Sequence, residues 1–157
     1  MTWRKIVIGA ALIAVFAVGR YVLYLRSERY VLDHSDQFIL YSLTWHSSPD
    51  VPTLGTFQRC GILGQTQITD PELRTNLVNA LYGSIRYSGG EASCFNPRHG
   101  IHATYGGRTV DAVICFECEQ VYFYENGQSN HQLISSEPQG LFNDALTAAH
   151  LPLSKRP

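Results

Sequence analysis

Hydrophobic positions dominate one segment near the N-terminus, which begins at Ile6 and ends at Leu25. Arg20 is the only charged residue in it, and basic residues flank it on both sides. As a helix that rises about 1.5 Å per residue, the segment would extend over roughly 30 Å, the thickness of the hydrocarbon core of a bilayer. The pattern therefore predicts a transmembrane helix. Residues 1–29 would form the membrane anchor and its connector, and residues 30–157 a single domain.

A cleaved signal peptide is the alternative for the same segment. Residues 6–19 have the length of the apolar region of a signal peptide, and residues 17–19 would form a tolerable cleavage site. The apolar run continues past that site to Leu25, and this favours the anchor. Basic residues nearly balance across the segment, but a short basic N-terminus usually stays in the cytoplasm. We therefore expect a single-pass membrane protein whose domain lies outside the cytoplasm.

Within residues 30–157, aromatic and β-branched runs predict strands at residues 37–43 and 57–68. A helix is predicted to follow, with Asp70 as its N-cap and Pro71 as its first residue, because these residue types suit those positions. Apolar residues recur along it every three or four positions, which is typical of a helix that packs against a core.

The second half of the domain is organised around a predicted β-hairpin. Two consecutive glycines, Gly106 and Gly107, predict its turn because both positions can adopt a positive φ. Strands are expected on both sides of the turn and at residues 120–124 and 132–135, and a short helix follows Pro138. The predicted fold class is therefore α+β, a mostly antiparallel sheet in the order β-β-α-β-β-β-α with both helices on one face.

The charge of the chain differs between its two parts. The chain has 157 residues and a formal net charge of −1, with five basic residues and one acid in residues 1–29. Residues 30–157 hold seven basic and twelve acidic residues. A mildly acidic domain without a basic stripe argues against nucleic acid as the main partner.

Four residues have a spacing that suits a metal site. Cys94, His99, Cys115 and Cys118 form the pattern C-x4-H-x15-C-x2-C, and three thiolates with one imidazole suit tetrahedral zinc. However, Cys115 and Cys118 lie in what is predicted to be one continuous strand, where side chains three residues apart point to opposite faces. Zinc would require a break in this strand at Glu117. Zinc is therefore the alternative to a site without a cofactor.

A disulfide is the second interpretation of the cysteines. With Tyr105 opposite Arg108, the register of the hairpin brings Cys94 within one residue of Cys118, and a bulge near Pro97 would let them face each other. We expect a Cys94–Cys118 disulfide if the compartment is oxidising.

Two further interpretations of the cysteines stay open. Cys115 and Cys118 form a C-x2-C pair that could be redox-active, although a strand interior lacks the helix N-terminus that lowers the pKa of such a thiol. Alternatively, all four cysteines are small buried hydrophobic side chains. Cys60, on another strand, could pair only with Cys115 or stay free.

The same hairpin carries a possible recognition patch made of Asn96, Arg98, His99, His102 and Asp111. By the hairpin register, His102 lies directly opposite Asp111, which could orient its ring. The alternative is that the histidine and the arginine of this loop bind backbone carbonyls. No nucleophile or paired carboxylate can be assigned, so we predict no catalytic residue and favour a protein that is not an enzyme.

The segment CFNPRHGI, followed by VDAVICFEC, resembles a pattern of uncharacterised bacterial proteins, in which a C-F-x-P-R-H-G segment precedes a hairpin and an I-C-F-x-C strand. The resemblance covers residues 37–153, with the strand LYSL and the helix LFNDAL. It implies a shared fold and carries over no catalytic role.

The sequence as a whole predicts a membrane-anchored binding or structural protein of the cell envelope. The alternative function is a zinc or thiol-redox site built on Cys94, His99, Cys115 and Cys118.

Overall fold

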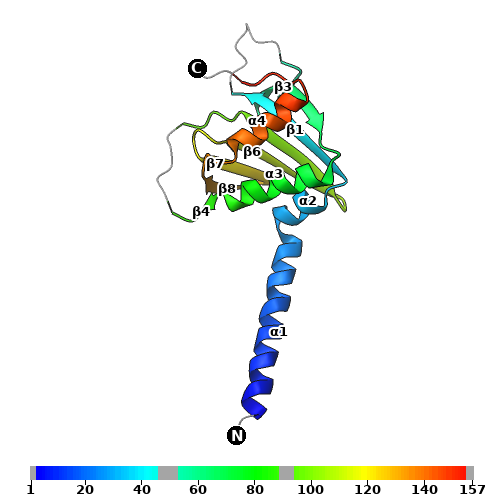
Figure 1. Cartoon of the computed structure of the whole chain (residues 1–157), viewed down its shortest axis with the longest axis vertical. Coiled ribbons are helices and arrows are strands. Elements are labelled where there is room, and N and C mark those ends of the chain that lie inside the picture. The colour runs from blue at the N-terminus through cyan, green and yellow to red at the C-terminus, as the bar shows by residue number, and fades with distance from the viewer. Residues whose placement is uncertain (1–2, 46–52, 89–93, 155–157) are drawn as a thin grey trace.

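The computed structural model describes residues 3–45, 53–88 and 94–154, with the backbone alone for residues 3–12 (Figure 1). Four helices form in these residues: α1 (Trp3–Arg26), α2 (Glu28–His34), α3 (Pro71–Gly83) and α4 (Gln139–Ala148). The Asp70 side chain accepts a hydrogen bond from the Glu72 N–H at the start of α3, as its N-cap position predicts. α1 extends away from the domain as a single long helix.

The described residues contain eight strands, which are β1 (Gln37–Thr44), β2 (Thr56–Phe57), β3 (Cys60–Gln67), β4 (Ile85–Arg86), β5 (His99–Tyr105), β6 (Arg108–Cys115), β7 (Gln120–Glu125) and β8 (Gln128–Ile134). They form one sheet in the order β2-β3-β1-β5-β6-β7-β8-β4, and every pair is antiparallel. The β5–β6 turn lies at Gly106 and Gly107, both with positive φ, which confirms the predicted hairpin and its register.

The predicted fold class is wrong in its elements. The described residues form eight strands where the predicted order has five, and α2 was not predicted as a separate helix. In the part of the chain that the structure describes, no helix is long and apolar enough to cross a membrane. This finding contradicts the transmembrane helix predicted from Ile6 to Leu25. It also contradicts the single-pass membrane localisation derived from that helix. The apolar residues of this segment do form a helix, but Arg20 interrupts their run.

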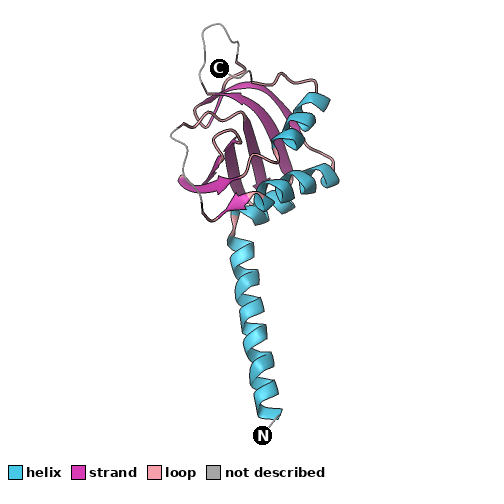
Figure 2. Cartoon of the chain, turned by 60° about the vertical axis from the view of Figure 1, so that its left-hand side comes forward, coloured by secondary structure: helices cyan, strands magenta, loops and turns pink. Residues whose placement is uncertain are grey.

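One face of the sheet is covered by α2, α3 and α4, and the main core lies between these layers (Figure 2). Alternate residues of the central strands point into it, so Phe38 and Leu40 of β1 are buried there, whereas Ile39 and Tyr41 lie on the other face. Burying one such Leu or Phe side chain contributes roughly 1.5–3 kcal/mol. The core residues with 0% exposure from the helices are Val31, Leu32, Leu77, Val78, Leu81, Phe142 and Leu146.

The other face of the sheet is covered by a hairpin instead of helices. The β2–β3 hairpin packs over it, with the Phe57 ring stacked on Tyr41 at 4.4 Å between centroids. A bulge between Ser42 and Leu43 in the pairing of β1 with β3 allows this curvature. The second cluster is small, so this face stays partly open.

The end of α1 is attached to the sheet by Arg108, the first residue of β6. Its guanidinium donates hydrogen bonds to the backbone carbonyls of Leu25, Arg26 and Ser27, at 3.0, 3.0 and 3.2 Å. It also pairs with the carboxylate of Glu125 at 2.6 Å. These contacts satisfy carbonyls that the end of a helix leaves without intrahelical partners.

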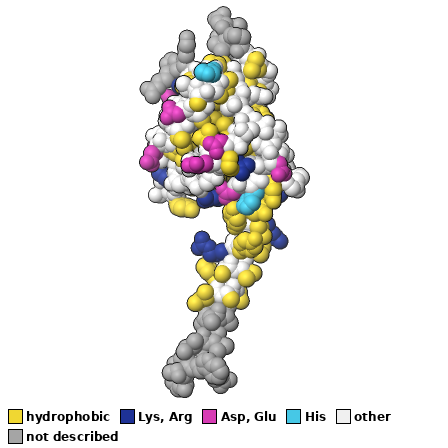
Figure 3. All heavy atoms as spheres, turned by 45° about the vertical axis from the view of Figure 1, so that its right-hand side comes forward, with side chains coloured by type: hydrophobic (Ala, Val, Ile, Leu, Met, Phe, Trp, Pro, Cys, Tyr) yellow, Lys and Arg dark blue, Asp and Glu magenta, His cyan; other side chains and the backbone are white. Residues whose placement is uncertain are grey.

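Charged side chains differ in number between the two parts of the chain, and residues 30–157 hold more acidic than basic residues. On the face drawn in Figure 3, Asp and Glu side chains are scattered over the domain, and Lys and Arg side chains are visible on α1 and on the domain.

Gly100 controls how closely the hairpin approaches the sheet. A Cβ at this position would lie 2.8 Å from Cε1 of Phe57 and 2.9 Å from Cδ1 of Leu43. We expect Gly100→Ala to lower the free energy of unfolding by about 1–3 kcal/mol, because overpacking forces the neighbours to move. Chemical denaturation measures this change. Gly83→Ala is the control, since nothing lies within 4 Å of its Cβ. Equal midpoints for the two variants would show that the contact with Phe57 is not a constraint.

Candidate functional site

Three cysteines lie together where β6 ends. The strand stops at Cys115, and residues 116–119 form a turn that ends with Glu119 at a φ of 55°. Because of this turn, Cys115 and Cys118 do not lie on one continuous strand, and their side chains need not point to opposite faces. Cys115 forms a disulfide with Cys118 at a Cα–Cα distance of 5.2 Å. The structure therefore replaces the predicted Cys94–Cys118 disulfide with Cys115–Cys118.

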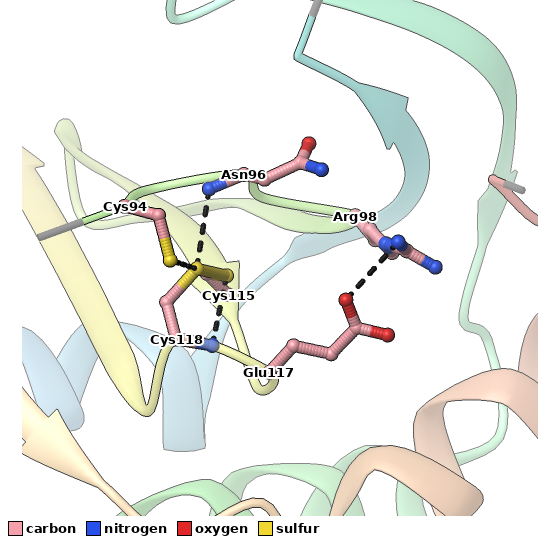
Figure 4. Close-up of a disulfide and its surroundings, with 6 residues drawn as sticks. All are labelled: Cys94, Asn96, Arg98, Cys115, Glu117 and Cys118. Atoms are coloured by element: carbon pink, nitrogen blue, oxygen red, sulfur yellow. Dashed lines mark hydrogen bonds and ion pairs between the residues drawn. A yellow bond between two sulfur atoms is a disulfide. The ribbon is translucent and has the colours of Figure 1, made fainter. Parts of the chain in front are cut away.

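Cys94 remains a free and exposed thiol beside this disulfide. Its Sγ lies 3.5 Å from the Sγ of Cys118. Figure 4 shows the two sulfur atoms side by side. The Asn96 N–H donates to the Cys118 Sγ at 3.3 Å, and the Cys118 N–H donates to the Cys115 Sγ at 3.1 Å. The predicted proximity of Cys94 to Cys118 is thus present, although the bond joins a different pair.

The acids of the turn are paired with arginines. Glu117 lies 3.0 Å from the Arg98 guanidinium, and Glu119 pairs with Arg86. Arg98 is only 8% exposed, so its pairing with Glu117 is weakly screened by solvent. The turn therefore carries little net negative charge near the disulfide.

The four predicted zinc ligands do not converge. His99 points to the helix-covered face, where its Nε2 lies 2.9 Å from the Oδ1 of Asn143 and its ring contacts Phe116 and Phe142. Among the described residues, no group of three or more His, Cys, Asp or Glu side chains is arranged to hold a metal ion. The break in the strand at Glu117, which a zinc site would require, is present. It brings Cys115 and Cys118 together in a disulfide.

His99 is a buried neutral histidine. Its side chain is 2% exposed, and burial, together with the nearby Arg98 charge, lowers its pKa to about 4. It lines a cavity of about 230 Å³ with Arg98, Gln139 and Asn143. No described residue accepts or donates at its Nδ1.

His102 and Asp111 lie on the opposite face, directly across the hairpin, as its register predicts. The His102 Nδ1 is 2.7 Å from Oδ1 of Asp111, and Gln58 Nε2 donates to Oδ2 at 2.6 Å. Both carboxylate oxygens are thus engaged. The predicted recognition patch is therefore divided: Asn96 binds the disulfide through its backbone, Arg98 and His99 face α4, and His102 with Asp111 lies on the open face.

One cavity on the open face, with aromatic walls, was not predicted from the sequence. It is a cavity of about 380 Å³ lined by Trp45, Gln58, Arg59, Phe95, Val113, Tyr122, Tyr124 and Ser129. The Phe95 ring lies edge to face with Trp45 and with Tyr122, at centroid distances of 6.1 and 4.8 Å. We call this cavity the aromatic pocket. Its one sequence signal is the alternation of Tyr122 and Tyr124 in β7, which puts two tyrosines on the same face.

No protein-family model, no curated protein and no solved structure matches the chain. The function is therefore inferred from the contacts and charges of its own residues.

We predict that stability depends on the protonation of His99. Its pKa is below that of the unfolded chain, so the unfolded state binds the proton more readily. The contribution of neutral His99 to the free energy of unfolding should be fully present above about pH 6.5. The free energy of unfolding should fall by roughly 3 kcal/mol as the pH drops to about 4. Urea denaturation across this range measures the effect. His99→Gln should remove most of this loss, whereas His34→Gln, at an exposed position, should keep it. The same loss in both variants would contradict the assignment to His99.

Proposed function

We propose that the domain is a binding module and that its ligand is a small, planar aromatic anion held in the aromatic pocket. The observation that carries the proposal is the composition of the pocket walls. Four of the eight residues that line it are aromatic, and Arg59 is the one cation among the described lining residues. None of the described residues that line it is acidic. Concave sites of this size with few polar groups are typical of small-molecule binding.

The aromatic side of the proposal rests on ring geometry. Tyr122 packs against Phe95 at 4.8 Å and against His131 at 4.6 Å, so its ring is held in place before a ligand arrives. Tyr124 continues the same wall, stacked with Tyr122 at 6.5 Å. Rings fixed in this way favour a flat ligand, because offset or edge-to-face contacts add to the burial of apolar area.

The anionic side of the proposal rests on the turn between β2 and β3. Gln58 and Arg59 have φ values of 46° and 69°, a region that costs non-glycine residues roughly 1–3 kcal/mol each. The conformation is held from both sides, by the stacking of Phe57 and by the hydrogen bond of Gln58 to Asp111. The strained turn fixes Arg59 at the pocket, where its guanidinium could bind a carboxylate.

Tyr124 can add a hydrogen bond to the same anion. Burial raises the pKa of its hydroxyl above the ordinary value of 10, so the group stays protonated at neutral pH. A protonated phenol can donate to a carboxylate, whereas a phenolate would repel it.

Naphthoate and its neutral counterpart naphthamide test the proposal by isothermal titration calorimetry on the full chain. We expect both to bind, and Arg59→Gln to weaken naphthoate by about tenfold, the effect of one lost charged hydrogen bond, without changing naphthamide. Tyr122→Leu should weaken both. Arg26→Gln removes an exposed arginine outside the pocket and should change neither. Absence of saturable naphthoate binding, or equal effects of the two arginine variants, would refute the proposal.

A further inference from the structure

The sulfur atoms beside β6 form a second site, independent of the aromatic pocket. A free thiol and a disulfide are in contact there, since the Cys94 Sγ lies 3.5 Å from the Cys118 Sγ. Their exposure differs: Cys94 is exposed, whereas Cys115 and Cys118 are 1% and 4% exposed. An attacking thiol therefore lies on the solvent side of a disulfide that solvent barely reaches.

We propose that Cys94, Cys115 and Cys118 form a thiol–disulfide exchange site in which Cys94 transfers the buried disulfide to the protein surface. The Cys94 thiol loses its proton to solvent, and the thiolate attacks the Sγ of Cys118. A Cys94–Cys118 bond forms as the Cys115–Cys118 bond breaks, and Cys115 leaves as a thiolate that takes up a proton. One thiol and one disulfide are present before and after, so the step requires no external oxidant or reductant.

Two backbone N–H groups are placed to assist this step. The Cys118 N–H, 3.1 Å from the Cys115 Sγ, would stabilise the negative charge that develops on the leaving sulfur. The Asn96 N–H, 3.3 Å from the Cys118 Sγ, holds the loop that bears Cys94 against the sulfur under attack.

Charge pairing around the site also favours a thiolate. Glu117 and Glu119, which flank Cys118, are bound by Arg98 and Arg86, so their repulsion of a sulfur anion is reduced. The buried Arg98 supplies positive charge close to the turn.

Exchange changes which sulfur an external thiol can reach. In the Cys115–Cys118 form, both bonded sulfurs are shielded. In the Cys94–Cys118 form, one bonded sulfur belongs to the exposed loop residue, where a small thiol such as glutathione, or the thiol of a partner protein, can attack it. The proposed site therefore passes electrons between an external thiol and a buried disulfide through Cys94.

The first test is the rate at which reduced glutathione opens the disulfide of the full chain. Samples are quenched with acid, alkylated and mapped by mass spectrometry. We expect Cys94→Ser, which keeps the side-chain shape but lacks the thiol, to slow reduction by about tenfold or more, because access to the bonded sulfurs is lost. Cys60→Ser removes the other free thiol, which is buried on another strand, and should leave the rate unchanged. Equal rates for the wild type and Cys94→Ser would overturn the proposal.

The second test traps the exchanged bond. Cys115→Ser leaves Cys94 and Cys118 as partners, and after oxidation with glutathione disulfide we expect a Cys94–Cys118 disulfide in a non-reducing peptide map. In the wild type, acid quenching should show alkylation divided between Cys94 and Cys115. A Cys115→Ser protein that keeps Cys94 and Cys118 as free thiols after oxidation would overturn the proposal, whatever the result of the rate measurement.

Discussion

The central strands have to bury side chains on both faces of the sheet, although helices cover only one of them. Phe38 and Ile101 are buried under the helices, while Tyr41 and Val113 are buried on the other face. The β2–β3 hairpin provides the second cover, and it can approach only because Gly100 has no side chain. The hairpin covers only part of this face. The aromatic pocket lies beside the hairpin, in the part of the face that stays open.

The aromatic pocket and the sulfur site share one segment of the chain. Phe95 lines the pocket and is the direct neighbour of Cys94, whose thiol contacts Cys118. The backbone of Asn96, the next residue, binds the same sulfur. A change of disulfide partner at Cys94 would therefore shift a wall of the pocket, which would couple binding to the redox state.

Local chemistry predicts part of this structure well. Consecutive glycines at residues 106–107 define the hairpin, because its turn needs a positive φ at both positions. Asp70 caps α3, because an N-cap favours a short side chain that accepts a backbone hydrogen bond. The turns at residues 58–59 and 116–119 could not be predicted, since neither contains Gly, Pro or Asn and tertiary contacts hold their positive φ angles. The missed second turn led to the wrong disulfide, and the missed first turn left the site of Arg59 unrecognised.

The guanidinium of Arg108 joins the end of α1 to a central strand of the sheet. It binds the last carbonyls of that helix from the first residue of β6, and β6 ends at Cys115, one partner of the disulfide. A single strand thus connects the end of α1 to the sulfur site. Because β6 is paired with β5 on one side and with β7 on the other, both attachments are made to the middle of the sheet. The helix and the disulfide therefore lie at opposite ends of one central strand.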